Sequence, residues 1–132
     1  MSETRDVVEE YFRRIGAGEH ERLPEMFADD VDWDVYGAEE VPWIGRRTTR
    51  ADVAAFFPIL TRNLKPVDFA LHRILVDGEH AVVIGHMRQT VVHNGNLFDS
   101  PIVFHLTVEN GLITRCRTYE DSLNLARAYG VV

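Results

Sequence analysis

Apolar and polar residues alternate with a period of two over most of the second half of the chain. The longest such stretch, residues 98–121, carries two alternating runs on either side of Glu109-Asn110-Gly111. Asn and Gly tolerate the positive φ angles of a tight turn, so this stretch predicts a long β-hairpin. On its first arm Val103 and His105 share one face, because successive side chains of a strand point to opposite sides. Neither arm has a purely polar face, so we expect both sides to be partly covered and one of them to line a cavity.

Other alternating runs predict further strands. They cover residues 31–36, 69–76 and 81–92, and the last two end at the turn signals Asp77-Gly78 and His93-Asn94-Gly95-Asn96. The segment between Gly37 and Arg47 holds two glycines and a proline and is expected to be a loop.

A helical spacing of apolar residues dominates the first half. It predicts a helix that ends near Gly16, a short helix around residues 23–27, a helix that begins at the cap residue Thr49, and a final short helix over residues 121–129. Pro58 lies inside the third of these helices and predicts a kink or a break near residues 54–57. Helices followed by strands indicate an α+β fold, with about three helices packed on a curved, mostly antiparallel sheet.

Composition narrows the class of protein. The chain has 132 residues, 45% of them hydrophobic, and a formal net charge of −7, which fits one globular domain over residues 1–132. Lys65 is the single lysine and no basic run occurs, so we expect neither a nucleic-acid nor a membrane partner. The single cysteine, Cys116, suits a reducing compartment, and the first residues lack the apolar core of a signal peptide. A cytoplasmic location is therefore expected.

Several motifs together resemble a known family. They are Phe27-Ala28-Asp29-Asp30-Val31, the Gly37–Gly45 loop, Asn110-Gly111-Leu112-Ile113 and Arg117-Thr118-Tyr119-Glu120-Asp121. Their order along essentially the whole chain resembles the SnoaL-like proteins of the nuclear transport factor 2-like superfamily, which also includes polyketide cyclases and ketosteroid isomerase. The resemblance implies a cone-shaped roll around a small-molecule pocket. It does not fix the chemistry, since this superfamily hosts isomerases, cyclases, hydrolases and non-enzymatic modules.

Matching positions within this resemblance suggest some roles. Tyr11 falls where ketosteroid isomerase has its oxyanion tyrosine, and Asp34 falls where that enzyme has its base. Val103 falls at the position of the protonated acid, so half of that oxyanion hole is absent. Thr118 stands where limonene epoxide hydrolase, a relative that activates water, has an aspartate.

The resemblance and the strand alternation together predict a pocket. Its polar members are expected to be Tyr11, Asp34, His86, Arg88, His105 and Glu120, and its further substrate-binding residues Phe56, Phe57, Leu60, Val103, Cys116 and Thr118. Asp34 or His105 would be the base of a proton transfer. Tyr11 and Arg88 would stabilise an enolate oxygen, while Glu120 would orient Arg88 or His105. The ligand would be a hydrophobic carbonyl compound, and the chemistry would need no cofactor.

Plainer interpretations remain open for the same residues. An Arg88–Glu120 pair could simply satisfy a polar core, and Asp34 could be solvated if Trp33 faces the core. His86 and His105 with Glu120 or Asp34 could ligate Fe(II) or Zn(II), but no HxH or HExxH motif supports this, so no metal is expected. The enzyme hypothesis, isomerase-, cyclase- or epoxide-hydrolase-like, therefore stands beside a non-catalytic ligand-binding or dimerisation module.

One apolar strip predicts an assembly. It lies on the hairpin face opposite His105 and comprises Phe104, Leu106, Val108, Ile113 and Tyr119. If helices covered the other face, this strip would be exposed on a monomer. A homodimer through the outer face of the sheet is therefore expected.

Overall fold

The computed structural model describes residues 3–132. Its elements follow one another along the chain in the order α1 (Glu3–Gly16), η1 (His20–Arg22), η2 (Pro24–Met26), β1 (Phe27–Val35), β2 (Gly45–Thr49), α2 (Arg50–Asn63), β3 (Leu64–Asp77), β4 (His80–Val91), β5 (Leu97–Glu109), β6 (Leu112–Glu120) and α3 (Ser122–Tyr129). Here η denotes a 3-10 helix. The architecture is α+β, as the order of patterns predicts.

The strands form one curved sheet in the order β2-β1-β6-β5-β4-β3. All neighbouring strands are antiparallel except β1 and β6. The long hairpin expected from the sequence is formed by β5 and β6, and its turn residues Asn110 and Gly111 have φ angles of 53° and 78°. Positive φ at both central residues is the geometry that Asn-Gly favours in a two-residue hairpin turn.

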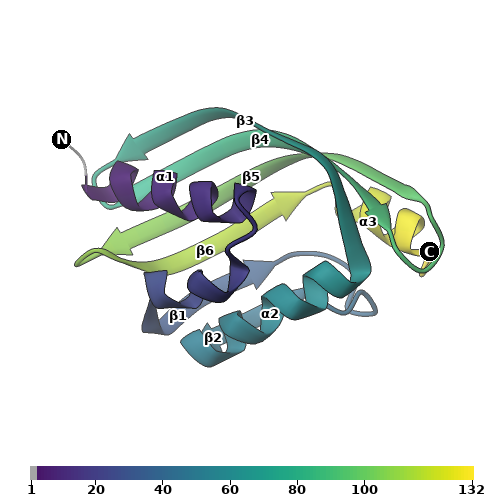
Figure 1. Cartoon of the computed structure of the whole chain (residues 1–132), viewed down its shortest axis with the longest axis horizontal. Helices are drawn as coiled ribbons and strands as arrows, with labels where there is room; N and C mark the ends of the chain where they lie inside the picture. The colour runs from purple at the N-terminus through teal and green to yellow at the C-terminus, as the bar shows by residue number, and fades with distance from the viewer. Residues whose placement is uncertain (1–2) are drawn as a thin grey trace.

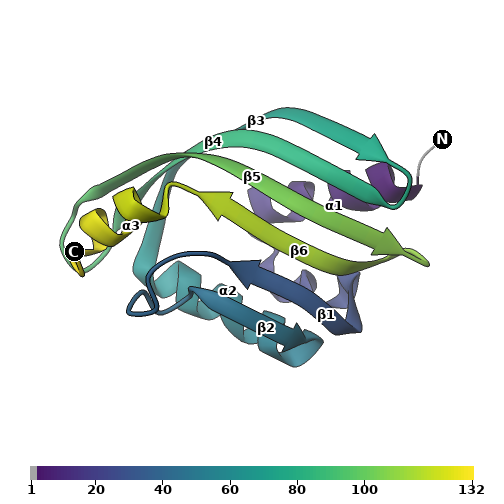
Figure 2. The ribbon, with the colours of Figure 1, turned by 180° about the vertical axis from the view of Figure 1, so that it is seen from behind.

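The two long helices lie on one face of the sheet (Figure 1). Helix α1 contacts β3, β4 and β5, whereas α2 contacts β1, β2 and β3. Seen from behind, the opposite face has no helix lying across it, and α3 sits at one end of the sheet (Figure 2). The two long helices therefore cover one face of the sheet, and we call that face its inner face.

The inner face carries the apolar side of the hairpin, which corrects the predicted assembly strip. Leu106, Val108 and Ile113 are at most 2% exposed, beneath the helices and not on an open surface. Phe104 contacts Phe12 of α1, with ring centroids 5.0 Å apart. Only Tyr119 of the strip is on the outer face. Alternation groups residues by face but does not say which face the helices cover, and for Phe104, Leu106 and Val108 the prediction chose the wrong one. The pairing of β5 with β6 shifts register between Thr107 and Val108, so Ile113 faces inward while Tyr119 does not.

Helix α2 begins as the sequence predicts but continues further. The Thr49 hydroxyl accepts a hydrogen bond from the Asp52 amide at 3.1 Å, which caps the first turn. The helix then runs through Pro58 to Asn63 without a break, so of the expected kink or break the break is absent. Pro58 removes one backbone donor, and the packing of Val53, Phe56 and Phe57 keeps the helix together.

Two strand boundaries also differ from the sequence prediction. Residues 27–30 belong to β1 and not to the end of a helix, and residues 45–49 form β2 where a loop is expected up to Arg47. Neither stretch has a clean apolar alternation, since GRRTT is entirely polar or glycine. Pairing with β1 makes β2 a strand, which is a tertiary effect. None of the helices within residues 3–132 is both long and apolar enough to span a membrane.

Candidate functional site

A cavity of about 130 Å³ lies between the inner face of the sheet and the helices. This volume is comparable to that of engineered apolar cavities of about 150 Å³ that hold benzene. We call it the inner cavity. Its lining comprises Tyr11, Phe12, Ile15, His20, Trp33, Val35, Trp43, Phe56, Phe57, Leu60, Leu64, Phe69, Met87, Gln89, Ile102, Phe104, Cys116, Thr118 and Glu120.

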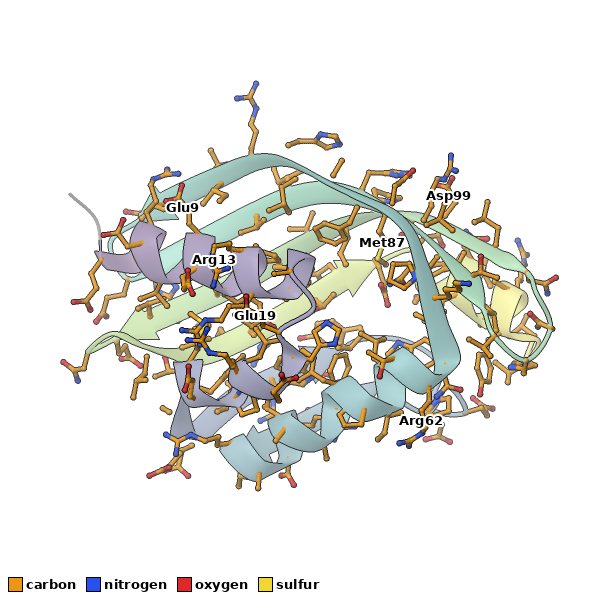
Figure 3. The ribbon with its side chains drawn as sticks, in the orientation of Figure 1. Glu9, Arg13, Glu19, Arg62, Met87 and Asp99 are labelled. Carbon is orange, nitrogen blue, oxygen red and sulfur yellow. The ribbon has the colours of Figure 1, made fainter. Side chains whose placement is uncertain are left out.

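Periodicity explains how separate elements reach this space. Tyr11 and Ile15 are four residues apart on α1 and therefore share one side of that helix. Cys116, Thr118 and Glu120 alternate along β6 and therefore share its inner face. Met87 of β4 is labelled in Figure 3 within the region framed by α1, α2 and β3. The wall is mainly aromatic and aliphatic, so a group inside it is poorly solvated.

Glu120 is the acidic side chain of this wall. It is the last residue of β6, and it is partly buried. Burial raises the pKa of its carboxyl from the usual 4.5 to about 7. Within residues 3–132 no hydrogen bond or ion pair to its carboxylate offsets that loss of solvation. A carboxyl group with a pKa near 7 can both accept and donate a proton at neutral pH.

Tyr11 and Cys116 are buried side by side in the same wall. Tyr11 is 2% exposed and Cys116 is 1% exposed. Burial raises the pKa of Tyr11 well above its usual value, and the neighbouring Cys116 thiol raises it further. Burial likewise raises the pKa of Cys116 to about 12. Both groups stay protonated at neutral pH, so Tyr11 is available as a hydrogen-bond donor and Cys116 is not a thiolate nucleophile.

A wider groove of about 790 Å³ adjoins the inner cavity, and we call it the outer groove. The two spaces share seven lining residues, which are Phe12, Ile15, His20, Leu60, Leu64, Phe69 and Gln89. The outer groove extends over the start of β3, where Lys65, Asp68 and Leu71 contribute to its wall. A ligand could therefore enter between the end of α1, the end of α2 and β3.

The structure brings seven of the sequence-predicted site residues to the inner cavity. They are Tyr11, Phe56, Phe57, Leu60, Cys116, Thr118 and Glu120. It does not bring the remaining five there, namely Asp34, His86, Arg88, Val103 and His105.

Strand alternation explains why these five residues do not line the inner cavity. Trp33, Met87 and Phe104 point inward to the cavity, so the residues next to each of them point outward. On β1 this affects Asp34. On β4 it affects His86 and Arg88, and on β5 it affects Val103 and His105.

The outward-facing residues find other partners. His86 Nε2 lies 2.8 Å from the Asp99 carboxylate, and Arg88 Nε lies 3.5 Å from that of Asp68. His105 Nε2 lies 3.0 Å from Nδ1 of His80. The expected Arg88–Glu120 and His105–Glu120 contacts are thus not formed.

With Glu120 as its carboxylate, the alternative metal site is divided between the two faces, whereas Asp34 lies on the same face as the two histidines. His86 and His105 are on the outer face, whereas Glu120 is on the inner face. Among residues 3–132, no three His, Cys, Asp or Glu side chains gather in a metal-binding arrangement.

Sequence reasoning missed several lining residues. Phe12 and Ile15 continue the stripe of Tyr11 on α1, so the helical spacing could have identified them. His20 lies in a 3-10 turn with no periodic signal, yet its ring stacks on Phe57 with centroids 6.0 Å apart. The sequence prediction puts Phe104 on the outer face with the rest of the strip, whereas its side chain lines the cavity.

The family model described as the SnoaL-like domain matches residues 8–116. No curated protein matches the sequence. An NTF2-like protein from Burkholderia xenovorans is 26% identical, with a TM-score of 0.84 over 97% of this chain and 96% of that one. An NTF2-like protein of unknown function from Burkholderia pseudomallei is 22% identical, with a TM-score of 0.87 over 98% and 99%. TerC, co-crystallised with polyporic acid, is 16% identical, with a TM-score of 0.84 over 97% and 98%.

Proposed function

The chain belongs to the SnoaL-like family, and from that premise we propose that it binds a hydrophobic carbonyl compound in the inner cavity and moves a proton on it without a cofactor. Glu120 would be the proton-transfer base. The observation that carries this proposal is the Glu120 carboxyl, which sits in an apolar cavity with its pKa raised to about 7. A base is most effective when its pKa lies near the working pH.

The proposed step accounts for the proton and the electron pair with groups that line the cavity. The Glu120 carboxylate takes the proton from the carbon next to the carbonyl group, and the electron pair of that C–H bond moves into an enolate. Tyr11, which keeps its proton, donates a hydrogen bond to the enolate oxygen. Glu120 then returns the proton to the same carbon or to a conjugated one, and the second course isomerises the compound.

The proposed base, Glu120, is not one of the two residues that the sequence favoured for this role. Asp34 and His105 lie on the outer face, away from the cavity lining. Glu120 was expected to orient another group, but neither Arg88 nor His105 contacts it. The proposal therefore keeps Tyr11 as an oxyanion donor and gives the role of base to Glu120.

A small-molecule ligand is also supported by the comparisons. TerC has been co-crystallised with polyporic acid, and its fold matches this chain over nearly its whole length. The second candidate function is a ligand-binding module without turnover. The apolar character of the inner cavity favours binding in either case, so turnover must be tested directly.

Proton exchange with deuterated water provides that test. Cyclohexanone, a ring of about the size that the cavity admits, is incubated with the protein in D₂O, and loss of its α-proton signal is followed by NMR. We expect exchange above the buffer rate that saturates with ketone concentration, because Glu120 removes α-protons in the cavity. Binding of cyclohexanone without added exchange would contradict the enzyme proposal and leave the ligand-binding module. Absence of binding would contradict the pocket itself.

We further propose that the protein is a homodimer through the outer face of the sheet. Tyr36 and Tyr119 are 37% and 44% exposed there, with ring centroids 5.1 Å apart. Arg46, Arg115 and Arg117 surround Asp32 on the same face and could form the polar rim of an interface. Light scattering at micromolar concentration should give twice the mass of the chain, and a monomer mass would contradict this assembly.

We also propose a cytoplasmic location. Cys116 is a free, buried thiol, and a protein with a single unpaired cysteine fits a reducing compartment.

A further inference from the structure

Trp33 has a buried polar atom that the proposed function does not use. Its side chain comes from β1, is 2% exposed and lines the inner cavity. The indole Nε1 is buried and makes no hydrogen bond within residues 3–132. Arg88 Nε is the other such atom, but it at least lies 3.5 Å from a carboxylate. A buried donor without an acceptor destabilises the folded protein, so its retention in a cavity wall calls for a reason.

Aromatic rings pack around the indole of Trp33. Its ring centroid lies 4.7 Å from that of Phe56, 5.8 Å from that of Phe27 and 6.0 Å from that of Phe57. These aromatic rings fix the indole in place and offer no oxygen lone pair. The N–H group is thus held in position before any ligand arrives, which lowers the cost of ordering it on binding.

We propose that Trp33 Nε1–H donates a hydrogen bond to an oxygen of the ligand, and thereby selects ligands whose buried end is a neutral, oxygen-bearing ring. This inference rests on the proposed function, because it concerns the ligand of the same cavity. A charged head group would lose its hydration in a wall that is mainly aromatic and aliphatic, so the buried end has to be neutral. The volume of about 130 Å³ admits one ring, and the outer groove of about 790 Å³ takes a larger substituent.

Trp33 differs from Tyr11 in what a ligand must displace. The Tyr11 hydroxyl already interacts with the Cys116 thiol, so an incoming oxygen competes with that contact. The Trp33 N–H has no partner to lose. Trp33 therefore sets selectivity for an oxygen acceptor in binding, whereas Tyr11 acts as charge develops on the oxygen.

The indole N–H signals of ¹⁵N-labelled protein test this inference. The chain has only two tryptophans, Trp33 and Trp43, so the spectrum has two indole peaks, and Trp33→Phe assigns them. The probes are cyclohexanone and methylenecyclohexane, which have the same shape but differ in the oxygen. We expect the Trp33 indole proton to move downfield with cyclohexanone and to move little with the hydrocarbon.

Affinities measured on the same two probes give a second readout. Trp33→Phe keeps an aromatic ring and removes the donor, so it should weaken cyclohexanone binding by about fivefold to tenfold and change methylenecyclohexane binding by less than about twofold. Equal indole shifts with both probes, or equal weakening of both, would overturn the inference. If this variant does not fold, Trp43→Phe assigns the two peaks instead, and the comparison of the two probes on the wild-type protein still decides.

The inference and the proposed function can fail separately. A selective indole shift without α-proton exchange would leave the Trp33 hydrogen bond in place and reject the enzyme. If α-proton exchange occurs but the Trp33 indole shifts equally with both probes, Glu120 remains the proposed base and the role of Trp33 is rejected.

Discussion

Replacement of Glu120 by Gln is expected to lower the rate of α-proton exchange by about a hundredfold or more, the range typical of a lost general base. Gln has nearly the size of Glu and fills the same place in the cavity wall, but its amide cannot accept the proton from carbon. The effect should appear in the maximal rate and not in ketone binding, because the apolar lining of the cavity is unchanged. NMR-detected exchange of cyclohexanone in D₂O measures both quantities.

Glu109→Gln provides the matched control. Glu109 is an exposed acid at the end of β5, beside the hairpin turn, and does not line the cavity. This variant should exchange cyclohexanone at the wild-type rate. Retention of the rate in Glu120→Gln, or its loss in Asp34→Asn, would show that Glu120 is not the base.

The second large effect concerns stability as a function of pH. The pKa of Glu120 is about 7 in the folded protein and near 4.5 when the chain is unfolded. Between these values the folded protein binds more protons at this site than the unfolded chain does, so the free energy of unfolding falls as the pH rises. At 1.36 kcal/mol per pKa unit, the full loss is about 3 kcal/mol, and it is complete above pH 7.

Denaturant unfolding at several pH values isolates this contribution. Glu120→Gln has no charge to bury, so it should become more stable than the wild type as the pH rises from 4.5 to 8, and the gain should level off above pH 7. At pH 4 ionisation of Glu120 should contribute little to the difference between their free energies of unfolding. Because other groups titrate in both proteins, only the difference between the two curves is informative. Parallel curves across this range would mean that Glu120 is not desolvated.

Local chemistry made much of the fold predictable. The hairpin turn at Asn110-Gly111 and the cap at Thr49 are signals carried by a few adjacent residues, and the structure has both. Segments whose state depends on distant partners were not predictable in the same way. The polar strand β2 exists because it pairs with β1, and α2 continues through Pro58 because its other residues are held by packing.

The candidate site was predictable only as sets of residues that share a face. Alternation correctly grouped Cys116, Thr118 and Glu120, and it correctly grouped Val103 with His105. It could not say which set the helices cover, and the choice for β1, β4 and β5 was the reverse of the structure. That choice depends on where α1 and α2 lie, which is not encoded in the spacing of any single strand.

The properties that make the site reactive also depend on tertiary packing. Glu120 has an unusual pKa only because several elements together exclude water from it. The sequence places Trp33 on the strand face opposite Asp34. Its position in the cavity wall and the absence of an acceptor for its N–H group are visible only once its neighbours are placed.

The most direct test of the central claim is a pH titration of the Glu120 side-chain carboxyl, followed by ¹³C NMR and assigned by the peak that Glu120→Gln removes. If Glu120 is a desolvated acid–base group at the cavity, its carboxyl resonance should titrate with a midpoint of about 7. A midpoint near 4.5, the ordinary value for glutamate, would contradict both the burial of this carboxyl and its role as the base.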